Sequence, residues 1–539
     1  MKAILQKVVS VSILLMLFVS MTKAQDLPDE NVEVVKEFEA RLADANKVPF
    51  HPVKETAELQ HPTFRYDIAE KILPVAYDPP VLKPLSMKTE PPPPIYNGFI
   101  KAGYGYPSSP YLDAGYYFVD RDDRSLLARI SHHSANDKSI ENLRFSDNDV
   151  NLTGRIVTDY GFAIEGAADV SLDNHFFYGY NRADTSFTKE EISNKLTYTG
   201  LGLKIYNVTE NRSKINYWTN ATVYRLGNEF DTRETALNLD IGLTKWLGNF
   251  PVSVTIGTDQ TALRDTIDKR TLSNFYLGTY FSFGTDNLRA KVGAKLGSSG
   301  DELFFYPDAE LLLNLVGNNL SVFVGAGGEL RSNTYKTLTD YNPFMVPRIN
   351  ALENTSFFDF YGGLKGLVAG LEFSAQAGYK PIKNLGLFEV NLDRPWARFD
   401  VLYDTVNVIY FQGSVKGELF PKFSIGGNII VNRFDAAVQD KAWFLPQVEG
   451  KAGVSYLALE DKLRIKADVF ARNSVSFQEL DLEDQPNALF DVSLGADFYV
   501  LENVGFFLQL NNLAANRYRR WYNYPTQSFN VLGGVTARF

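Results

Sequence analysis

Leu463-Arg464-Ile465-Lys466-Ala467-Asp468-Val469 is the stretch of sequence from which the fold class follows most directly. The apolar residues occupy the odd-numbered positions, and the charged residues occupy the even-numbered positions between them. Because successive side chains of a β-strand point to opposite faces, this stretch predicts a strand with one apolar face and one charged face. Residues 288–296, 490–500 and 529–539 alternate in the same way, and the pattern begins near residue 96. We therefore expect an all-β fold.

Short turn-forming segments interrupt the strands, and consecutive ones are separated by two strands joined by a longer polar stretch, such as 174–194 or 332–354. Short turns on one rim and long loops on the other are typical of a transmembrane antiparallel β-barrel, and a sandwich or a propeller does not sort its connections this way. Ten turns separate eleven hairpins, which predicts about 22 strands, with irregular segments near Tyr306, 388–392 and Val406 leaving the count open by two. The turns are expected at 120–123, 159–161, 209–212, 247–249, 285–287, 317–319, 368–370, 421–422, 459–462 and 501–503.

The first 95 residues differ from the barrel, which we place at 96–539. Residues 1–24 contain an apolar core after Lys2 and Lys7, and they end in Thr22-Lys23-Ala24, which predicts a secretory signal peptide. Residues 25–95 hold 12 of the 24 prolines, which favours an extended periplasmic tail. A short amphipathic helix is expected within 32–45. Its apolar face would be a possible partner-binding surface made of Val34, Val35, Phe38 and Leu42.

Composition restricts the chemistry of the chain. It has no cysteine, five histidines and a formal net charge of -10, so disulfides and thiolate metal sites are excluded and nucleic acid is a poor partner. The sequence has no HExxH, GxSxG or P-loop motif, and we expect a non-enzymatic protein without cofactor or metal. Residues 479–484 include four carboxylates that could hold Ca²⁺, although a hydrated acidic loop is the simpler interpretation. Signal peptide and barrel together predict the bacterial outer membrane, with its lipid as a partner.

The parity of each strand also predicts which charged residues face the lumen. Both signs occur there, which suggests ion-paired walls rather than a pore selective for one sign. Aromatic residues near strand ends, namely Trp246, Trp443 and Tyr456, are expected in interface girdles. A barrel of 22 strands has a backbone diameter of roughly 44 Å, so the tail, the long loops or another protein must close it. The predicted lumen-facing residues are Arg155, Lys291, Asp308, Glu310, Lys416, Glu418, Lys451, Arg464, Lys466, Asp468 and Asp497.

The end of the chain resembles a known family. Asn511-Asn512-Leu513, the run from Arg517 to Pro525 and the terminal Arg538-Phe539 resemble the last two strands and final loop of TonB-dependent transporters. The resemblance implies a 22-strand barrel, and it implies that Phe539 is recognised by the outer-membrane assembly machinery. The high content of Tyr, Phe and Asn is similar to that of Bacteroidota proteins.

The N-terminal segment departs from the family pattern. Members of the family carry a globular N-terminal plug, and the Pro-rich residues 25–95 are too few to form a complete one. We therefore expect a plugless barrel that serves as a subunit or scaffold of an outer-membrane complex for assembly, secretion or uptake, with a protein partner on the periplasmic side or in the lumen. The alternative is a solute or nutrient transporter or channel, either passive or TonB-coupled.

Overall fold

The computed structural model describes residues 96–183, 185–317, 319–393, 395–477 and 487–539. The predicted signal peptide, the Pro-rich tail with Val34, Val35, Phe38 and Leu42, and the carboxylates of 479–484 lie outside these ranges, so the predictions about them stay predictions. Within the described ranges, no helix combines the length and the apolar composition needed to cross a membrane.

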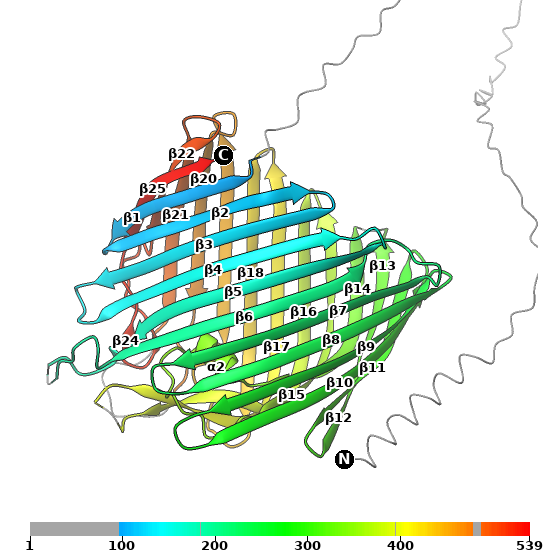
Figure 1. Ribbon diagram of the computed structural model, residues 1–539, viewed down its shortest axis with the longest axis horizontal. Coiled ribbons are helices and arrows are strands. Elements are labelled where there is room, and N and C mark those ends of the chain that lie inside the picture. The colour runs from blue at the N-terminus through cyan, green and yellow to red at the C-terminus, as the bar shows by residue number, and fades with distance from the viewer. Residues whose placement is uncertain (1–95, 184, 318, 394, 478–486) are drawn as a thin grey trace, which may run out of the picture. The chain divides into compact units, whose positions relative to one another are not determined.

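The described chain forms one large antiparallel sheet and a small two-stranded sheet (Figure 1). The first half of the large sheet contains β1 (Gly98–Tyr106), β2 (Ser109–Arg121), β3 (Arg124–Asp137), β4 (Leu143–Val157), β5 (Phe162–Phe176), β6 (Ser193–Asn207), β7 (Ile215–Asn228), β8 (Arg233–Leu247), β9 (Phe250–Arg264), β10 (Lys269–Gly284) and β11 (Leu288–Ser299). The second half contains β12 (Glu302–Pro307), β13 (Ala309–Val316), β14 (Leu320–Ser332), β15 (Asn354–Val368), β16 (Leu371–Asn391), β17 (Arg398–Phe420), β18 (Phe423–Ala436), β19 (Val448–Ala458), β20 (Leu463–Arg472), β21 (Leu489–Tyr499), β22 (Val504–Asn511) and β25 (Asn530–Arg538).

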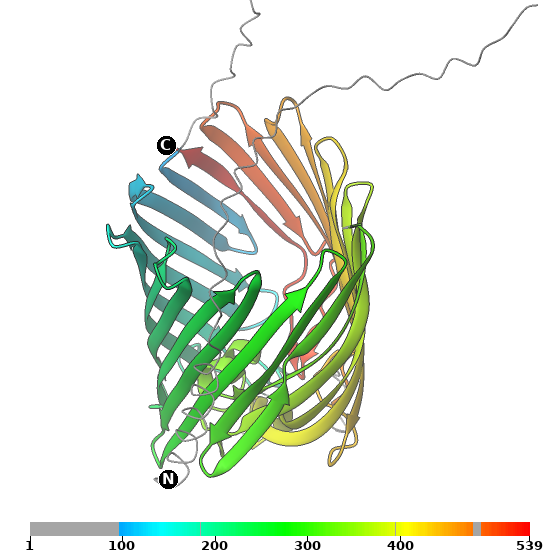
Figure 2. The same ribbon diagram turned by 90° about the vertical axis from the view of Figure 1, so that its right-hand side faces the viewer.

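The sheet closes on itself, because β1 pairs with β25 in antiparallel register, with Lys101 opposite Thr536. Figure 2 shows the first strand of the barrel, in blue, beside the last strand, in red, near the C-terminus. The sheet has 23 pieces, but β12 and β13 both pair with β11 and are two parts of one strand broken at Asp308. Counting them once gives 23 − 1 = 22 strands, which confirms the predicted closed antiparallel barrel.

The ten predicted short turns all fall between consecutive strands of the barrel. The opposite rim differs from expectation, because its connections are not uniformly long. Only Pro107 and Ser108 join β1 to β2, and only Gly300 and Asp301 join β11 to β12. Gly300 has a φ of +57°, a backbone conformation that glycine adopts without steric cost and that permits so tight a turn.

The outward face of the wall is apolar, as Leu237, Ile256 and Phe275 on neighbouring strands illustrate with their exposed side chains. In a membrane protein such a face contacts hydrocarbon, and closure of the sheet leaves no backbone edge unpaired there. Trp246 and Tyr456 are exposed as expected of girdle residues. The prediction for Trp443 is wrong: this residue is buried, because the connection that carries it folds into an apolar core.

Candidate functional site

The long connections of one rim pack together into a compact unit that we call the loop cap. It consists of the described residues of 177–192, 333–353, 392–397, 437–447, 473–477 and 512–529, and it includes α2 (Tyr335–Tyr341), β23 (Arg519–Trp521) and β24 (Tyr524–Pro525). In Figure 1, α2 and β24 lie near the barrel end opposite the C-terminus. The buried apolar core of the cap contains Phe177, Tyr178, Tyr180, Ile192, Tyr335, Leu338, Met345, Ile349, Trp396, Trp443, Phe444, Val475, Trp521, Tyr522 and Tyr524.

Segments from opposite walls of the barrel meet in this cap. The N–H of Ala397 donates to the carbonyl of Gly179 at 2.8 Å, and Tyr180 forms an isolated β-bridge with Trp396. These two connections follow β5 and β16, so ten strands separate them along one side of the barrel and twelve along the other. Since the barrel is roughly 44 Å across, the two loops can touch only by crossing its interior. The loop cap therefore spans the mouth of the barrel.

Aromatic rings make up the centre of the cap. Phe344 stacks on Tyr524 with ring centroids 3.8 Å apart, and Trp521 lies 5.2 Å from Phe399 and 5.1 Å from Phe444. Each such pair contributes about 0.5–1.5 kcal/mol beyond the burial of its surface. Burial raises the pKa of Tyr524 well above its usual range, so its hydroxyl stays protonated and donates to the carbonyl of Ala397 at 2.6 Å.

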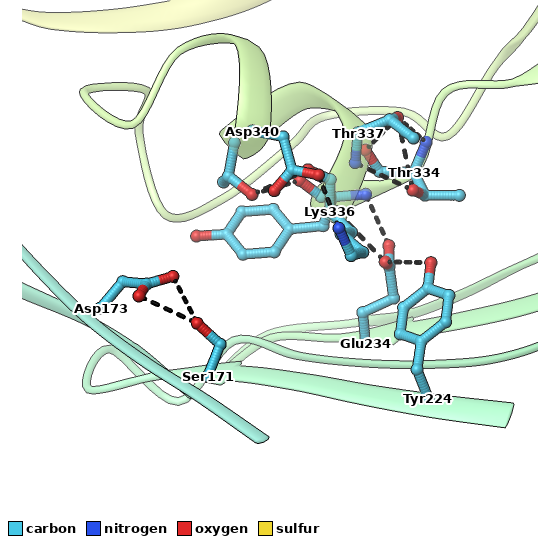
Figure 3. A network of polar contacts seen from close by, with 10 residues as sticks. Ser171, Asp173, Tyr224, Glu234, Thr334, Lys336, Thr337 and Asp340 are labelled. Atoms are coloured by element: carbon cyan, nitrogen blue, oxygen red, sulfur yellow. Dashed lines mark hydrogen bonds and ion pairs between the residues drawn. The ribbon is translucent and has the colours of Figure 1, made fainter. Parts of the chain in front are cut away.

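A buried carboxylate attaches α2 to the barrel wall. Glu234, from β8, accepts hydrogen bonds from the hydroxyl of Tyr224 at 2.9 Å and from the backbone N–H groups of Tyr335 at 2.5 Å and Lys336 at 3.1 Å. Figure 3 shows the Glu234 carboxylate between the tyrosine ring and the first turn of the helix. Thr334 caps the same turn through a reciprocal bond with Thr337, so the free N–H groups at the helix start have acceptors.

A second polar contact holds the far end of the α2 connection. Arg270 donates to the carbonyl of Ile349 at 2.6 Å and to Asp265 at 3.1 Å, and Arg348 lies 3.7 Å from the same carboxylate. Asp265 is in the β9–β10 connection and is buried. Burial acts to raise the pKa of Asp265, but hydrogen bonds from two backbone N–H groups and the Arg270 guanidinium outweigh it, so the pKa is lowered.

A cavity of about 810 Å³ lies between α2 and the wall formed by β6 to β14. Tyrosine rings and charges of both signs line it. The cavity therefore offers stacking surfaces and hydrogen-bonding groups, and neither sign of charge is alone in its lining. Among the described residues, no group of three or more His, Asp or Glu side chains is placed to hold a metal ion. Lining residues that matter for the chemistry are Tyr198, Tyr276, Tyr280, Lys291, Lys295, Asp308 and Lys336.

Several of the predicted lumen-facing residues have partners on neighbouring strands. Lys291 lies 2.7 Å from Asp308, and both line the cavity beside α2. Lys416, Lys451 and Asp468 line a second hollow of about 470 Å³ on β17 to β21. Whether any of these residues acts on a solute stays a prediction. The other contacts are Arg155 to Glu165 at 3.6 Å, Glu310 to the Tyr361 hydroxyl at 2.9 Å, Lys416 to Glu372 at 2.9 Å, Glu418 to the backbone N–H of Lys422, and Asp497 to Lys101 at 3.5 Å.

The remaining predicted residues occupy less informative places. Arg464 and Lys466 lie on β20, opposite Asp497 and Gly495 of β21. Phe539 closes the sheet through reciprocal backbone bonds with Gly98 and stacks on Tyr116. Its proposed recognition by assembly machinery is untested by these contacts. Sequence reasoning missed Glu234, Asp265 and the aromatic cap, although the density of aromatic residues in 174–194 and 518–524 was a usable signal.

No family model and no curated protein matches the sequence. Solved structures do match the fold. The FrpB iron transporter from Neisseria meningitidis aligns with a TM-score of 0.66 at 10% identity, over 82% of this chain and 81% of its own. The ferric-catecholate import receptor Fiu from E. coli K12 aligns with a TM-score of 0.62 at 11% identity, over 83% and 82%. The copper transporter OprC aligns with a TM-score of 0.60 at 11% identity, over 83% and 80%.

These three structures are described as an iron transporter, an import receptor and a copper transporter. At 10–11% identity the likeness is one of fold. The closed 22-strand barrel of this chain and its apolar outward face indicate the bacterial outer membrane as its location.

Proposed function

We propose that the chain is an outer-membrane transport barrel whose extracellular mouth is closed by its own loop cap. The observation that carries the proposal is the meeting of Gly179 and Ala397 from opposite walls, with a polar and aromatic cavity of about 810 Å³ directly beside α2. In outer-membrane barrels the longer loops face the exterior, so this cap would lie on the outside. Passage of a solute would require the cap to rearrange, after which the cavity offers the first binding surface.

The names of the similar structures support transport over scaffolding, since they describe iron and copper transporters and an import receptor. The cargo of this chain is a solute that can use tyrosine faces and charges of both signs, because those groups line the cavity. The expectation of a subunit or scaffold with a periplasmic protein partner has weaker support, and so do a Bacteroidota origin, a missing plug and engagement of TonB.

Planar-bilayer conductance tests the proposal. The wild-type barrel should conduct little, and replacing residues 335–349 with a short Gly-Ser linker should open large, long-lived conductances. A double substitution, Lys189→Ala with Glu190→Ala, changes an exposed ion pair of a loop and should leave conductance low. Heat-modifiable migration in gel electrophoresis verifies that each barrel is folded. Equal silence of folded wild type and loop replacement would refute the role of the cap, and co-purification of a stoichiometric periplasmic protein would favour the scaffold.

A further inference from the structure

Three basic residues face one another on neighbouring strands at the long-loop end of the barrel. Arg233 of β8 is directly opposite Arg264 of β9, and Arg264 is directly opposite Lys269 of β10. Like charges directly opposite each other in an antiparallel sheet are destabilising. An anionic partner would relieve this repulsion and stabilise the arrangement.

These side chains are on the outward face of the wall. Arg233 has the parity of Leu237 on β8, Arg264 has that of Ile256 on β9, and Lys269 has that of Phe275 on β10, and all three of those apolar residues are exposed. Two more cations are on the outward face of the preceding strands by the same alternation, Lys195 on β6 and Arg225 on β7, where Arg225 is opposite Thr235, two residues from Arg233. We call Lys195, Arg225, Arg233, Arg264 and Lys269 the outer cationic row.

The protein supplies only part of the counter-charge. Lys195 lies 3.6 Å from Glu229, and Arg233 lies 3.5 Å from Asp231, both as solvent-exposed pairs. Within the described residues, no carboxylate oxygen lies within 4 Å of the charged groups of Arg225, Arg264 or Lys269. Asp268, the nearest acid in sequence, accepts from the backbone N–H of Lys269 and pairs with Arg270. On a chain with a net charge of -10, this local excess of positive charge is unusual.

The height of the row relative to the apolar band indicates what it meets. From Leu237 to Arg233 the strand advances four residues, which at about 3.4 Å per residue and a tilt of roughly 40° is about 10 Å along the barrel axis. Thr235 fills the intervening outward position. The polar headgroup layer is roughly 5–8 Å thick on each side, so a residue about 10 Å beyond an apolar position just inside the hydrocarbon edge lies at the level of this layer. The cations therefore stand beside headgroups.

We propose that the outer cationic row binds the phosphate groups of anionic lipids in the outer leaflet of the outer membrane. Arginine guanidinium groups match phosphate oxygens bidentately, and outward cations distributed over five strands spaced about 4.8 Å apart match a layer of headgroups rather than a single ion. The inference rests on the barrel fold and on the extracellular position of the long loops. It is independent of whether the barrel transports anything.

The test compares charge variants in nanodiscs of phosphatidylcholine with and without diphosphoryl lipid A. The triple variant Arg233→Gln, Arg264→Gln, Lys269→Gln should bind lipid A roughly 100-fold more weakly than wild type, since each surface cation contributes about fivefold to binding of anionic lipid. Native mass spectrometry counts the retained lipid A molecules. The matched control Arg212→Gln, Lys214→Gln, Lys245→Gln removes three cations at the short-turn end of the barrel. This variant should retain as many lipid A molecules as wild type.

Thermal unfolding supplies a second readout that separates binding from folding. In pure phosphatidylcholine, Arg264→Gln should raise the midpoint temperature of unfolding, because it removes the repulsion of Arg264 by Arg233 and Lys269. In discs that contain lipid A, the same variant should unfold at a lower midpoint temperature than wild type. Equal retention of lipid A by wild type and triple variant would overturn the proposal. A full stabilisation of wild type by inorganic phosphate in neutral discs would overturn it as well, because the row would then be a site for a free anion.

Discussion

The barrel wall and the loop cap both carry large apolar side chains, and these face different surroundings. In the wall, Ile256 and Phe275 point outward and are more than half exposed, whereas in the cap Trp521 is 5% exposed and Phe444 is fully buried. Wall residues contact few protein atoms, and cap residues pack as in the core of a soluble protein. The comparison teaches that the wall is specified by alternation and by closure of the hydrogen-bonded sheet, and the cap by side-chain complementarity.

The largest difference is expected when an aromatic ring is truncated in each region. Trp521→Ala removes contacts with Phe388, Phe399 and Phe444, and we expect it to destabilise the cap by about 3–5 kcal/mol. Phe275→Ala on the wall should cost less, because lipid or detergent fills the space left behind. Hydrogen exchange measured by mass spectrometry should show faster exchange in cap peptides for the first variant only. Similar losses in both regions would contradict the distinction.

A smaller effect is expected at the junction of the two regions. Glu234→Ala leaves the hydroxyl of Tyr224 and the N–H groups of Tyr335 and Lys336 without their acceptor, which should cost about 2–3 kcal/mol in the stability of α2. Glu234→Gln keeps one oxygen and should recover part of the loss. The hydrogen-exchange rates of the backbone amides of 334–342 measure this loss. Glu190→Ala, at an exposed site, is the control. Unchanged rates in the alanine variant would show that the contact does not hold the helix.

The smallest effect concerns acid. Because the folded pKa of Asp265 is lowered from an ordinary value of 3.8, its carboxylate stabilises the cap above that value and loses the contribution as pH falls through the folded pKa. Loss of this contribution should lower the free energy of local unfolding of 333–353 by on the order of 1 kcal/mol. Proteolytic cleavage within this segment should therefore become faster below about pH 4. Asp265→Asn should lack this acid-dependent step, while Asp268→Asn at an exposed site should keep it. A cleavage rate in the wild type that is flat with pH would contradict this role.

How far the sequence predicts each region follows from the same contrast. In β20, alternation from Leu463 to Val469 defines both the strand and its faces, and the short turns fix the strand count. The break at Asp308 follows Pro307, which cannot donate to the ladder, and it lies beside the irregular segment expected near Tyr306.

The cap offers no such periodicity. The contact of Tyr180 with Trp396 joins residues more than 200 positions apart, and no local pattern encodes it. For that reason Trp443 was expected at the membrane interface and is found in the core of the cap. Glu234 was invisible to the same reasoning, since its importance depends on a helix about 100 residues later in the chain.

The pairing of β1 with β25 has a consequence for biosynthesis. Gly98 exchanges backbone hydrogen bonds with Phe539, so the barrel cannot close until the residues of β25 have been synthesised. Every nascent or truncated form carries two unpaired sheet edges, which are templates for aggregation. Contacts between residues so distant in sequence also form slowly. The newly exported polypeptide must therefore be kept apart from its copies by chaperones until its final strand arrives.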